Sequence, residues 1–329
     1  MTPMNNSTPT PQFIQIYQAQ ADHIREELLS GLRASKAHTS PKYLYDELGS
    51  KLFEAITCIP EYYPTRTEAL IFNTHGHEMA KQVPKGSVFI DLGAGNCEKA
   101  AKLFNVFQPS RYVAVDISVD FLKGSLECLQ RQFPELEMSG VGMDFSSELT
   151  LPAGLALNPA QPRVMFYPGS SIGNFTPEEA LLFLKQVHVE CSIAPGGGLL
   201  IGVDLVKSKA VLEAAYDDAL GVTAAFNRNM LLHFNTLAGT NFELQDWKHI
   251  GLYNTELNRI EMHLEALRDV VVNWEGGERQ FVEGERIHTE NSYKWTLTGF
   301  EDMLKRAGFV SSKAYTDPEQ KFAVFWAQA

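Results

Sequence analysis

Three motifs in the middle of the chain follow short apolar runs, and their residues could hold a nucleoside-containing ligand. Asp91-Leu-Gly-Ala-Gly-Asn-Cys-Glu-Lys99 follows the first run directly and opens a helical pattern. Glycines in such a loop let the backbone turn tightly and approach a ligand without a side-chain clash. A dinucleotide-binding fingerprint would place a third glycine where this chain has Glu98. The loop is therefore not adapted to close contact with a pyrophosphate.

Two acidic motifs follow the next two apolar runs. Asp116 ends the second run, where a carboxylate can accept hydrogen bonds from both ribose hydroxyls. Asp144-Phe145 ends the third, where the acid can accept from an adenine amino group while the ring lies against the base. Asp144-Phe145 alone is equally compatible with an ordinary turn. Ligands bind at the carboxyl ends of parallel strands, so the three motifs together predict an adenosine-containing cofactor.

The elements that must position these motifs alternate between strand and helix, which is typical of a parallel sheet in an α/β fold. The expected strands are 87–91, 111–116, 137–143, 163–167 and 198–204, and the expected helices between them are 98–107, 119–132 and 177–192. Thr176 is suited to cap the last of these helices, because Pro177 and two acidic residues follow it.

The alternation stops after residue 206. Residues 207–293 hold helical patterns and polar strands, a stretch far longer than an ordinary loop. A helix is expected again over 297–307, followed by a hairpin of the runs 309–315 and 321–326. We expect one domain, built on the parallel sheet, from 67–206 plus 294–329, and a second, substrate-binding domain from 13–66 plus 207–293. Residues 1–12, rich in Thr, Pro and Asn, are expected to form a disordered tail.

Composition excludes several classes of protein. The 329 residues carry a formal net charge of −12 and lack a dense run of Lys or Arg, so nucleic acid is not expected as a partner. No apolar run approaches the length of a membrane span, and no signal peptide is recognisable. The four scattered cysteines favour reduced thiols in the cytoplasm. His75 and His77 are interpreted as helix surface, because no further ligands complete a metal site.

Several longer segments are specific enough to indicate a family. They are 43–66 (YLYDELGSKLFEAITCIPEYYPTR), 167–176 (YPGSSIGNFT), 204–229 (DLVKSKAVLEAAYDDALGVTAAFNRN), 259–262 (RIEM) and 288–294 (HTENSYK). They resemble the histidine-specific methyltransferases of ergothioneine biosynthesis, and the Asp-x-Gly-x-Gly loop resembles the first motif of class I methyltransferases. The resemblance covers nearly everything after the tail. It implies a class I, Rossmann-like methyltransferase sheet with an inserted substrate-binding domain.

The resemblance also implies an activity and a site. Members of the family transfer three methyl groups from S-adenosylmethionine to the α-nitrogen of L-histidine, giving hercynine. By the matching motifs, the residues that bind the cofactor would be Gly93, Lys99, Asp116, Asp144 and Phe145. The amino acid's backbone end would be held by Tyr62, Asn174 and Tyr216, and its imidazole by Glu290 and Ser292 with Met262 beside it. This chain reads Gly-Ala-Gly-Asn-Cys where family members often have Gly-Ser-Gly-Thr-Ser, which removes hydroxyls near the cofactor.

The residue types support these roles to different degrees. The amide of Asn174 can both donate and accept, so it can contact an amine and a carboxylate together. A carboxylate at Glu290 can accept an imidazole N–H, although a solvated acid is the plain alternative. Tyr62 and Tyr216 could equally be packing residues, and Met262 an ordinary core methionine. No His or Lys base is evident for the amine, so we expect catalytic roles for Asn174 and for Tyr45 or Tyr216, which would orient the nitrogen while water removes its proton.

Three other functions are compatible with parts of the pattern. The same chemistry could act on tryptophan or another amine, although Glu290 and Met262 argue against that substrate. A catalytically silent S-adenosylmethionine-binding protein is a second alternative, and a nicotinamide dehydrogenase, disfavoured by Glu98, is a third. We expect a monomeric enzyme that acts on a small-molecule substrate, without a metal and without a membrane partner.

Overall fold

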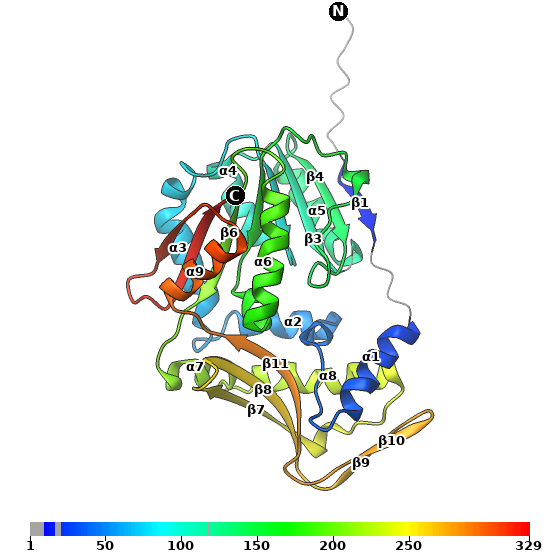
Figure 1. Ribbon diagram of the computed structural model, residues 1–329. Coiled ribbons are helices and arrows are strands. Elements are labelled where there is room, and N and C mark those ends of the chain that lie inside the picture. Colours follow the sequence, from blue (N-terminus) through cyan, green and yellow to red (C-terminus); the bar gives the residue numbers. More distant parts are fainter. Residues whose placement is uncertain (1–9, 17–20, 118) are drawn as a thin grey trace, which may run out of the picture.

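The computed structural model describes residues 10–16, 21–117 and 119–329, and one large sheet dominates its upper half (Figure 1). In these residues the sheet has eight strands, in the order β1-β4-β3-β2-β5-β6-β13-β12. Its strands are β1 (Gln12–Gln15), β2 (Val88–Leu92), β3 (Arg111–Asp116), β4 (Glu137–Gly142), β5 (Arg163–Tyr167), β6 (Gly198–Asp204), β12 (Ser311–Thr316) and β13 (Phe322–Gln328). Strands β2 to β6 run parallel to one another. Strand β13 runs antiparallel to both of its neighbours, β6 and β12. The predicted class I methyltransferase sheet is therefore confirmed.

Helices cover both faces of this sheet because alternate strand residues point to opposite sides. Phe89 packs in a core with α3 (Tyr63–Met79), α4 (Glu98–Phe107) and α5 (Val119–Gln132), whereas Ile90 packs in a core with α6 (Pro177–Cys191) and α9 (Leu297–Ala307). Helix α6 begins with the predicted cap, since Thr176 and Glu179 form a reciprocal capping box. None of the helices in the described part of the chain is both long and apolar enough to cross a membrane.

A second unit lies below the large sheet in Figure 1. Its three-stranded antiparallel sheet is made of β7 (Trp247–Asn254), β8 (Arg259–Ala266) and β11 (Arg286–Tyr293), in the order β11-β8-β7. A separate hydrophobic core joins it to α1 (Ala21–Arg33), α2 (Glu47–Ile56) and α8 (Val222–Ala238). The remaining elements are α7 (Lys209–Tyr216), the hairpin of β9 (Val270–Trp274) and β10 (Gly277–Phe281), and the short 3-10 helices η1 (Pro41–Leu44), η2 (Ala153–Leu155), η3 (Ser171–Asn174) and η4 (Leu244–Asp246).

The N-terminal segment differs from the expectation. Strand β1 pairs in parallel with β4, from Gln12 opposite Ser139 to Gln15 opposite Gly142, and so belongs to the large sheet. From the sequence, residues 1–12 are expected to form a tail and residues 13–66 to belong to the second unit. The backbone groups of β4 would otherwise form an open edge, and β1 satisfies them. Residues 1–9 of the expected tail lie outside the described residues.

Candidate active site

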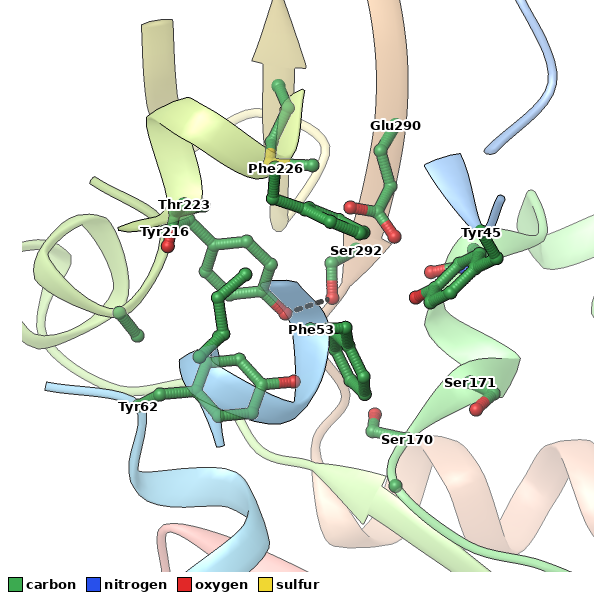
Figure 2. Close-up of a pocket in the computed structure, with 15 residues that line it drawn as sticks. Tyr45, Phe53, Tyr62, Ser170, Ser171, Tyr216, Thr223, Phe226, Glu290 and Ser292 are labelled. Atoms are coloured by element: carbon green, nitrogen blue, oxygen red, sulfur yellow. Dashed lines mark hydrogen bonds between the residues drawn. The ribbon is translucent and has the colours of Figure 1, made fainter. Parts of the chain in front are cut away.

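A pocket opens between the carboxyl ends of the central strands and the second unit, which is where ligands bind in open α/β sheets. The structure brings all the residues expected to handle the amino acid to its wall, as Figure 2 shows for most of them. They are Tyr45, Tyr62, Asn174, Tyr216, Met262, Glu290 and Ser292. These side chains come from six separate segments of the chain, so the pocket exists only when the two units are packed together.

Asn174 reaches the pocket through the loop after β5. It ends η3, and the glycine before it makes the position possible: a Cβ at Gly173 would lie 2.9 Å from the backbone oxygen of Tyr293 in β11. Only a residue without a side chain allows this close approach. The Asn174 side chain lies close enough to Glu290 to oppose the rise in the pKa of that carboxyl, and both residues line the pocket. The loop after β5 thus brings Asn174 to the strand that carries Glu290.

The register of β8 and β11 aims Glu290 and Met262 at the same ligand. Glu290 pairs directly with Met262, and directly paired residues of an antiparallel ladder share a face. The register shifts between His288 and Glu290, and an extra residue of this kind bends the strand and re-aims the side chains beyond it. Ser292 follows on the same face, two residues along. The imidazole-binding residues expected from the sequence are therefore adjacent.

Burial changes the acidity of the pocket's carboxyl group. Burial raises the pKa of Glu290 to about 7, against the opposing effects of the Lys294 ammonium and the Asn174 hydrogen bond. A carboxyl group with a pKa near neutral can change its charge within the physiological range. Glu290 is half-buried at the pocket wall, so it is less solvated than a surface carboxylate.

Aromatic rings form the opposite wall (Figure 2). Tyr45 makes edge contacts with Phe53 of α2 and Phe226 of α8, each with ring centroids 5.5 Å apart. Tyr62 and Tyr216 contact each other with centroids 6.1 Å apart. Burial raises the pKa of Tyr62 and of Tyr216 well above the usual value, so both phenols keep their protons at neutral pH. They can orient a ligand as hydrogen-bonding groups but are poorly suited to act as bases.

A buried charged group, which the sequence does not reveal, lies behind this wall. Asp204, at the end of β6, accepts hydrogen bonds from Tyr63 Oη at 2.7 and 2.8 Å and pairs with Lys207 at 2.6 Å and Lys294 at 2.8 Å. Burial alone would raise the pKa of Asp204, but the two ammonium groups lower it below its usual value. Ninety positions separate Asp204 from Lys294, and no local spacing signals such a pairing.

The glycine loop has the conformation expected of a cofactor site. Gly93 and Gly95 adopt left-handed φ values of +71° and +54°, which side chains rarely tolerate. The backbone N–H of Gly95 donates to Asp116 Oδ2 at 3.0 Å, so Asp116 braces the loop from the end of β3. Burial raises the pKa of Asp116 above its usual value, while hydrogen bonds from the Gly95 and Ile117 amides oppose the shift. A carboxylate beside an open glycine loop is suited to the ribose hydroxyls of S-adenosylmethionine.

Phe145 and Asp144 lie on the far side of the same loop. The Phe145 ring is 3.7 Å from where a Cβ on Gly93 would be, so the ring and the loop face each other. Asp144 accepts hydrogen bonds from the backbone and hydroxyl of Ser146, as a turn residue does. Both the turn role and the adenine-binding role are compatible with this geometry, because a carboxylate has acceptor capacity beyond these bonds.

Lys99 has a partner that the sequence did not reveal. Its Nζ lies 2.7 Å from Oε2 of Glu68, which is almost fully buried in α3. The other oxygen of Glu68 accepts from the backbone N–H of Gly169 at 2.7 Å. Glu68 therefore ties the expected cofactor lysine to the loop that leads to Asn174. Lys99 keeps further donors for a ligand, since an ammonium has three.

The residues that replace the family's usual hydroxyls have structural roles here. Asn96 Oδ1 accepts from the backbone N–H of Glu98 at 3.2 Å and so helps to start α4. Cys97 is buried, with a left-handed φ of 61° at the N-cap of this helix. Burial raises the pKa of its thiol to about 12. Cys97 is therefore an unreactive packing group, and the polar contacts of the loop come from its backbone.

Comparison with known proteins agrees with this geometry. The family model described as "Histidine-specific methyltransferase, SAM-dependent" matches residues 24–329. A histidine N-alpha-methyltransferase from Mycolicibacterium smegmatis is 34% identical over 310 residues, covering 92% of this chain and 94% of the relative. One from Mycobacterium tuberculosis is 35% identical over 315 residues, covering 92% and 93%.

Solved structures of lower similarity include other methyltransferases. A S-adenosylmethionine-dependent methyltransferase from Clostridium acetobutylicum is 12% identical, with a TM-score of 0.43, and the alignment covers 85% of this chain and 96% of that one. The family rests on the two closer relatives and on a family model that matches most of the chain. The chain belongs to the histidine-specific, S-adenosylmethionine-dependent methyltransferases.

Proposed function

We propose that this chain transfers methyl groups from S-adenosylmethionine to the α-nitrogen of L-histidine, three in succession, to give hercynine. The observation that carries the proposal is the register that places Glu290, Met262 and Ser292 together in one pocket with Asn174. The pocket combines an acceptor for a ring N–H with a polar group near the cofactor sheet. Relatives named histidine N-alpha-methyltransferase support the same substrate.

The cofactor supplies a methyl group that is already activated on a sulfonium. Asp116 is suited to its ribose, Phe145 to its adenine, and the Gly93 loop and Lys99 to its amino-acid part. What the chain must add is orientation and exclusion of water, which together account for much of the rate in such transfers. Asn174 stands between the two ligands and can contact the amine and the carboxylate of histidine.

The aromatic wall suits an amine that becomes progressively methylated. Each transfer makes the nitrogen bulkier and removes an N–H donor, until a quaternary ammonium remains. Rings of Tyr45, Phe53 and Phe226 can attract such a cation through their π faces without needing a hydrogen bond. Tryptophan or another bulky amine as substrate is less favoured, because an indole is larger than the imidazole ring for which Glu290, Met262 and Ser292 are suited.

Product analysis tests this function directly. The purified chain is incubated with S-adenosylmethionine and equal amounts of all twenty amino acids, and the products are measured by mass spectrometry. We expect trimethylation of histidine alone. Methylation of a different amino acid would retain the chemistry and overturn the imidazole role of Glu290. Cofactor binding without any product would support the silent-binder alternative instead.

The amine must lose its proton before each transfer, and we propose that water takes it while a tyrosine orients the nitrogen. Tyr45 is 40% exposed and so reaches both the pocket and solvent, whereas Tyr216 is held by Ser292 at 2.8 Å. Removing one hydroxyl bond of this kind should lower kcat by about tenfold in Tyr45→Phe or Tyr216→Phe. Steady-state rates over a range of pH measure the effect. Unchanged rates and pH profiles in both variants would overturn the proposed role.

From the sequence we also propose that the chain has two domains, 67–206 plus 294–329 and 13–66 plus 207–293. We propose that it is a monomer, that it is located in the cytoplasm and that it acts without a metal. The strand β1 belongs with the first of these units rather than the second. Two separate hydrophobic cores on the large sheet, and a large and a small one in the second unit, support the general division.

A further inference from the structure

The ammonium of Lys294 touches the substrate pocket from behind. Its Nζ lies 2.7 Å from Ser292 Oγ, 3.1 Å from Tyr216 Oη and 2.8 Å from Asp204 Oδ2. The Lys294 side chain is fully buried and Asp204 almost so. A buried charge of this kind is maintained only by partners that satisfy it, and these three acceptors satisfy all three N–H groups.

One hydroxyl proton has no acceptor within the group that Lys294 forms with Asp204, Ser292 and Tyr216. An ammonium can only donate, so the oxygens of Ser292 and Tyr216 both accept from Lys294. The two hydroxyls also bond each other at 2.8 Å, which uses one of their two protons (Figure 2). The second hydroxyl proton has no acceptor within the group. It is available to a ligand in the pocket that both side chains line.

We infer that Lys294 is a positioning residue that makes the Tyr216–Ser292 pair a hydrogen-bond donor, and that this donor selects the unprotonated ring nitrogen of the substrate. The inference rests on the proposed function, because it presumes an imidazole in the pocket. A neutral imidazole has one N–H and one bare nitrogen. Glu290 takes the N–H, and Ser292, on the same face of β11, supplies the complementary donor.

The charges around the pocket agree with this arrangement. Two lysines share the single carboxylate of Asp204, so the buried group carries one excess positive charge. Lys294 opposes the rise in the pKa of Glu290 that burial causes, and so favours the anionic form that accepts an N–H. Lys294 thus supports both the hydroxyl donor and the Glu290 acceptor, two groups that an indole cannot match together.

Ring analogues of histidine test the inference by binding alone. Pyrrolylalanine isomers keep a ring N–H and lack the bare nitrogen, so the free hydroxyl donor stays unsatisfied when they bind. With S-adenosylhomocysteine present, calorimetry should show them binding to the wild type about tenfold more weakly than histidine, the cost of one unmet hydrogen bond. In Lys294→Met, which keeps the length of the side chain and removes its charge, this ratio should fall to near one.

Matched variants separate positioning from general damage. Lys207→Met removes the other ammonium on Asp204, which touches neither pocket hydroxyl, and should leave the pyrrolyl ratio at the wild-type value. If Lys294→Met does not fold, the double variant Asp204→Asn/Lys294→Met removes both charges of the pair and should give the same collapsed ratio.

Two results would overturn the inference. One is a pyrrolyl ratio that stays at its wild-type value without Lys294. The other is a Lys294→Met protein that loses discrimination only against histidinol, a histidine analogue without the carboxylate. The hydroxyl donor would then serve the carboxylate end of the substrate. Failure of the wild type to bind histidine at all would instead refute the proposed function and is visible in the first titration.

Discussion

Replacing Glu290 by alanine should lower kcat/KM for L-histidine by roughly thirtyfold, most of it in KM. The change removes a hydrogen bond between a carboxylate and an imidazole N–H, and bonds to charged groups are worth about 2 kcal/mol, which corresponds to this factor. The Asn174 amide also loses its partner on β11. Steady-state kinetics with histidine and with tryptophan as competing substrates measure both the loss and the accompanying decline in preference.

A matched control is available nearby. Glu283→Gln removes an exposed negative charge a few residues earlier in the chain, outside the pocket, and should leave both kinetic constants unchanged. A Glu290→Ala variant with wild-type KM for histidine would contradict the imidazole assignment. It would also leave the aromatic wall as the main source of substrate affinity.

The same residue predicts a pH dependence. Burial raises the pKa of Glu290 to about 7, so the carboxylate that accepts the imidazole N–H prevails above that pH and is lost as the pH falls below it. For the wild type, kcat/KM should therefore decline more steeply below pH 7 than for Glu290→Gln, which is neutral throughout. Both proteins meet the same ionisation of free histidine, so a difference between the two profiles reports on the group at position 290.

Replacing Asp116 by alanine should weaken the binding of S-adenosylmethionine by roughly hundredfold. Two charge-assisted hydrogen bonds to the ribose hydroxyls together contribute about 3 kcal/mol, which corresponds to this factor. The variant also frees the Gly95 N–H that Asp116 Oδ2 holds at 3.0 Å, so the glycine loop loses its brace. Titration calorimetry with S-adenosylhomocysteine measures the loss without any turnover.

The control for Asp116 lies in the following helix. Asp120 is exposed in the first turn of α5, where it pairs with Lys123, and Asp120→Ala should bind the cofactor as the wild type does. Asp116→Asn keeps one acceptor oxygen and should fall between the two. An Asp116→Ala protein with undiminished affinity would show that the ribose is held elsewhere, and the nucleoside site would have to be reassigned.

The cofactor half of the molecule was predictable because its signals are local. The helices 98–107, 119–132 and 297–307 begin and end where the residue patterns place them, since caps and apolar spacing act within a few residues. Thr176 caps α6 for the same reason. The motifs at the ends of β2 and β3 follow directly from a parallel sheet, whose ligand edge is common to every strand.

The substrate residues were predictable only through family resemblance. Tyr62, Tyr216 and Met262 have residue types that more often form core than sites, and nothing in their spacing separates the two. The pairing of Met262 with Glu290 depends on a register shift in β11 that one-residue slips would destroy. Such a shift is chosen by packing over the whole second unit.

The strands of the α/β sheet, its glycine loop and its acidic strand ends can be recognised from residues a few positions apart. The pairing of β1 with the sheet edge and the contact of Lys294 with Asp204 behind the pocket depend on the assembled fold. Both contacts join segments distant in the chain. Their free energy comes from satisfying backbone and charged groups that burial has removed from water, and burial is a property of the assembled fold.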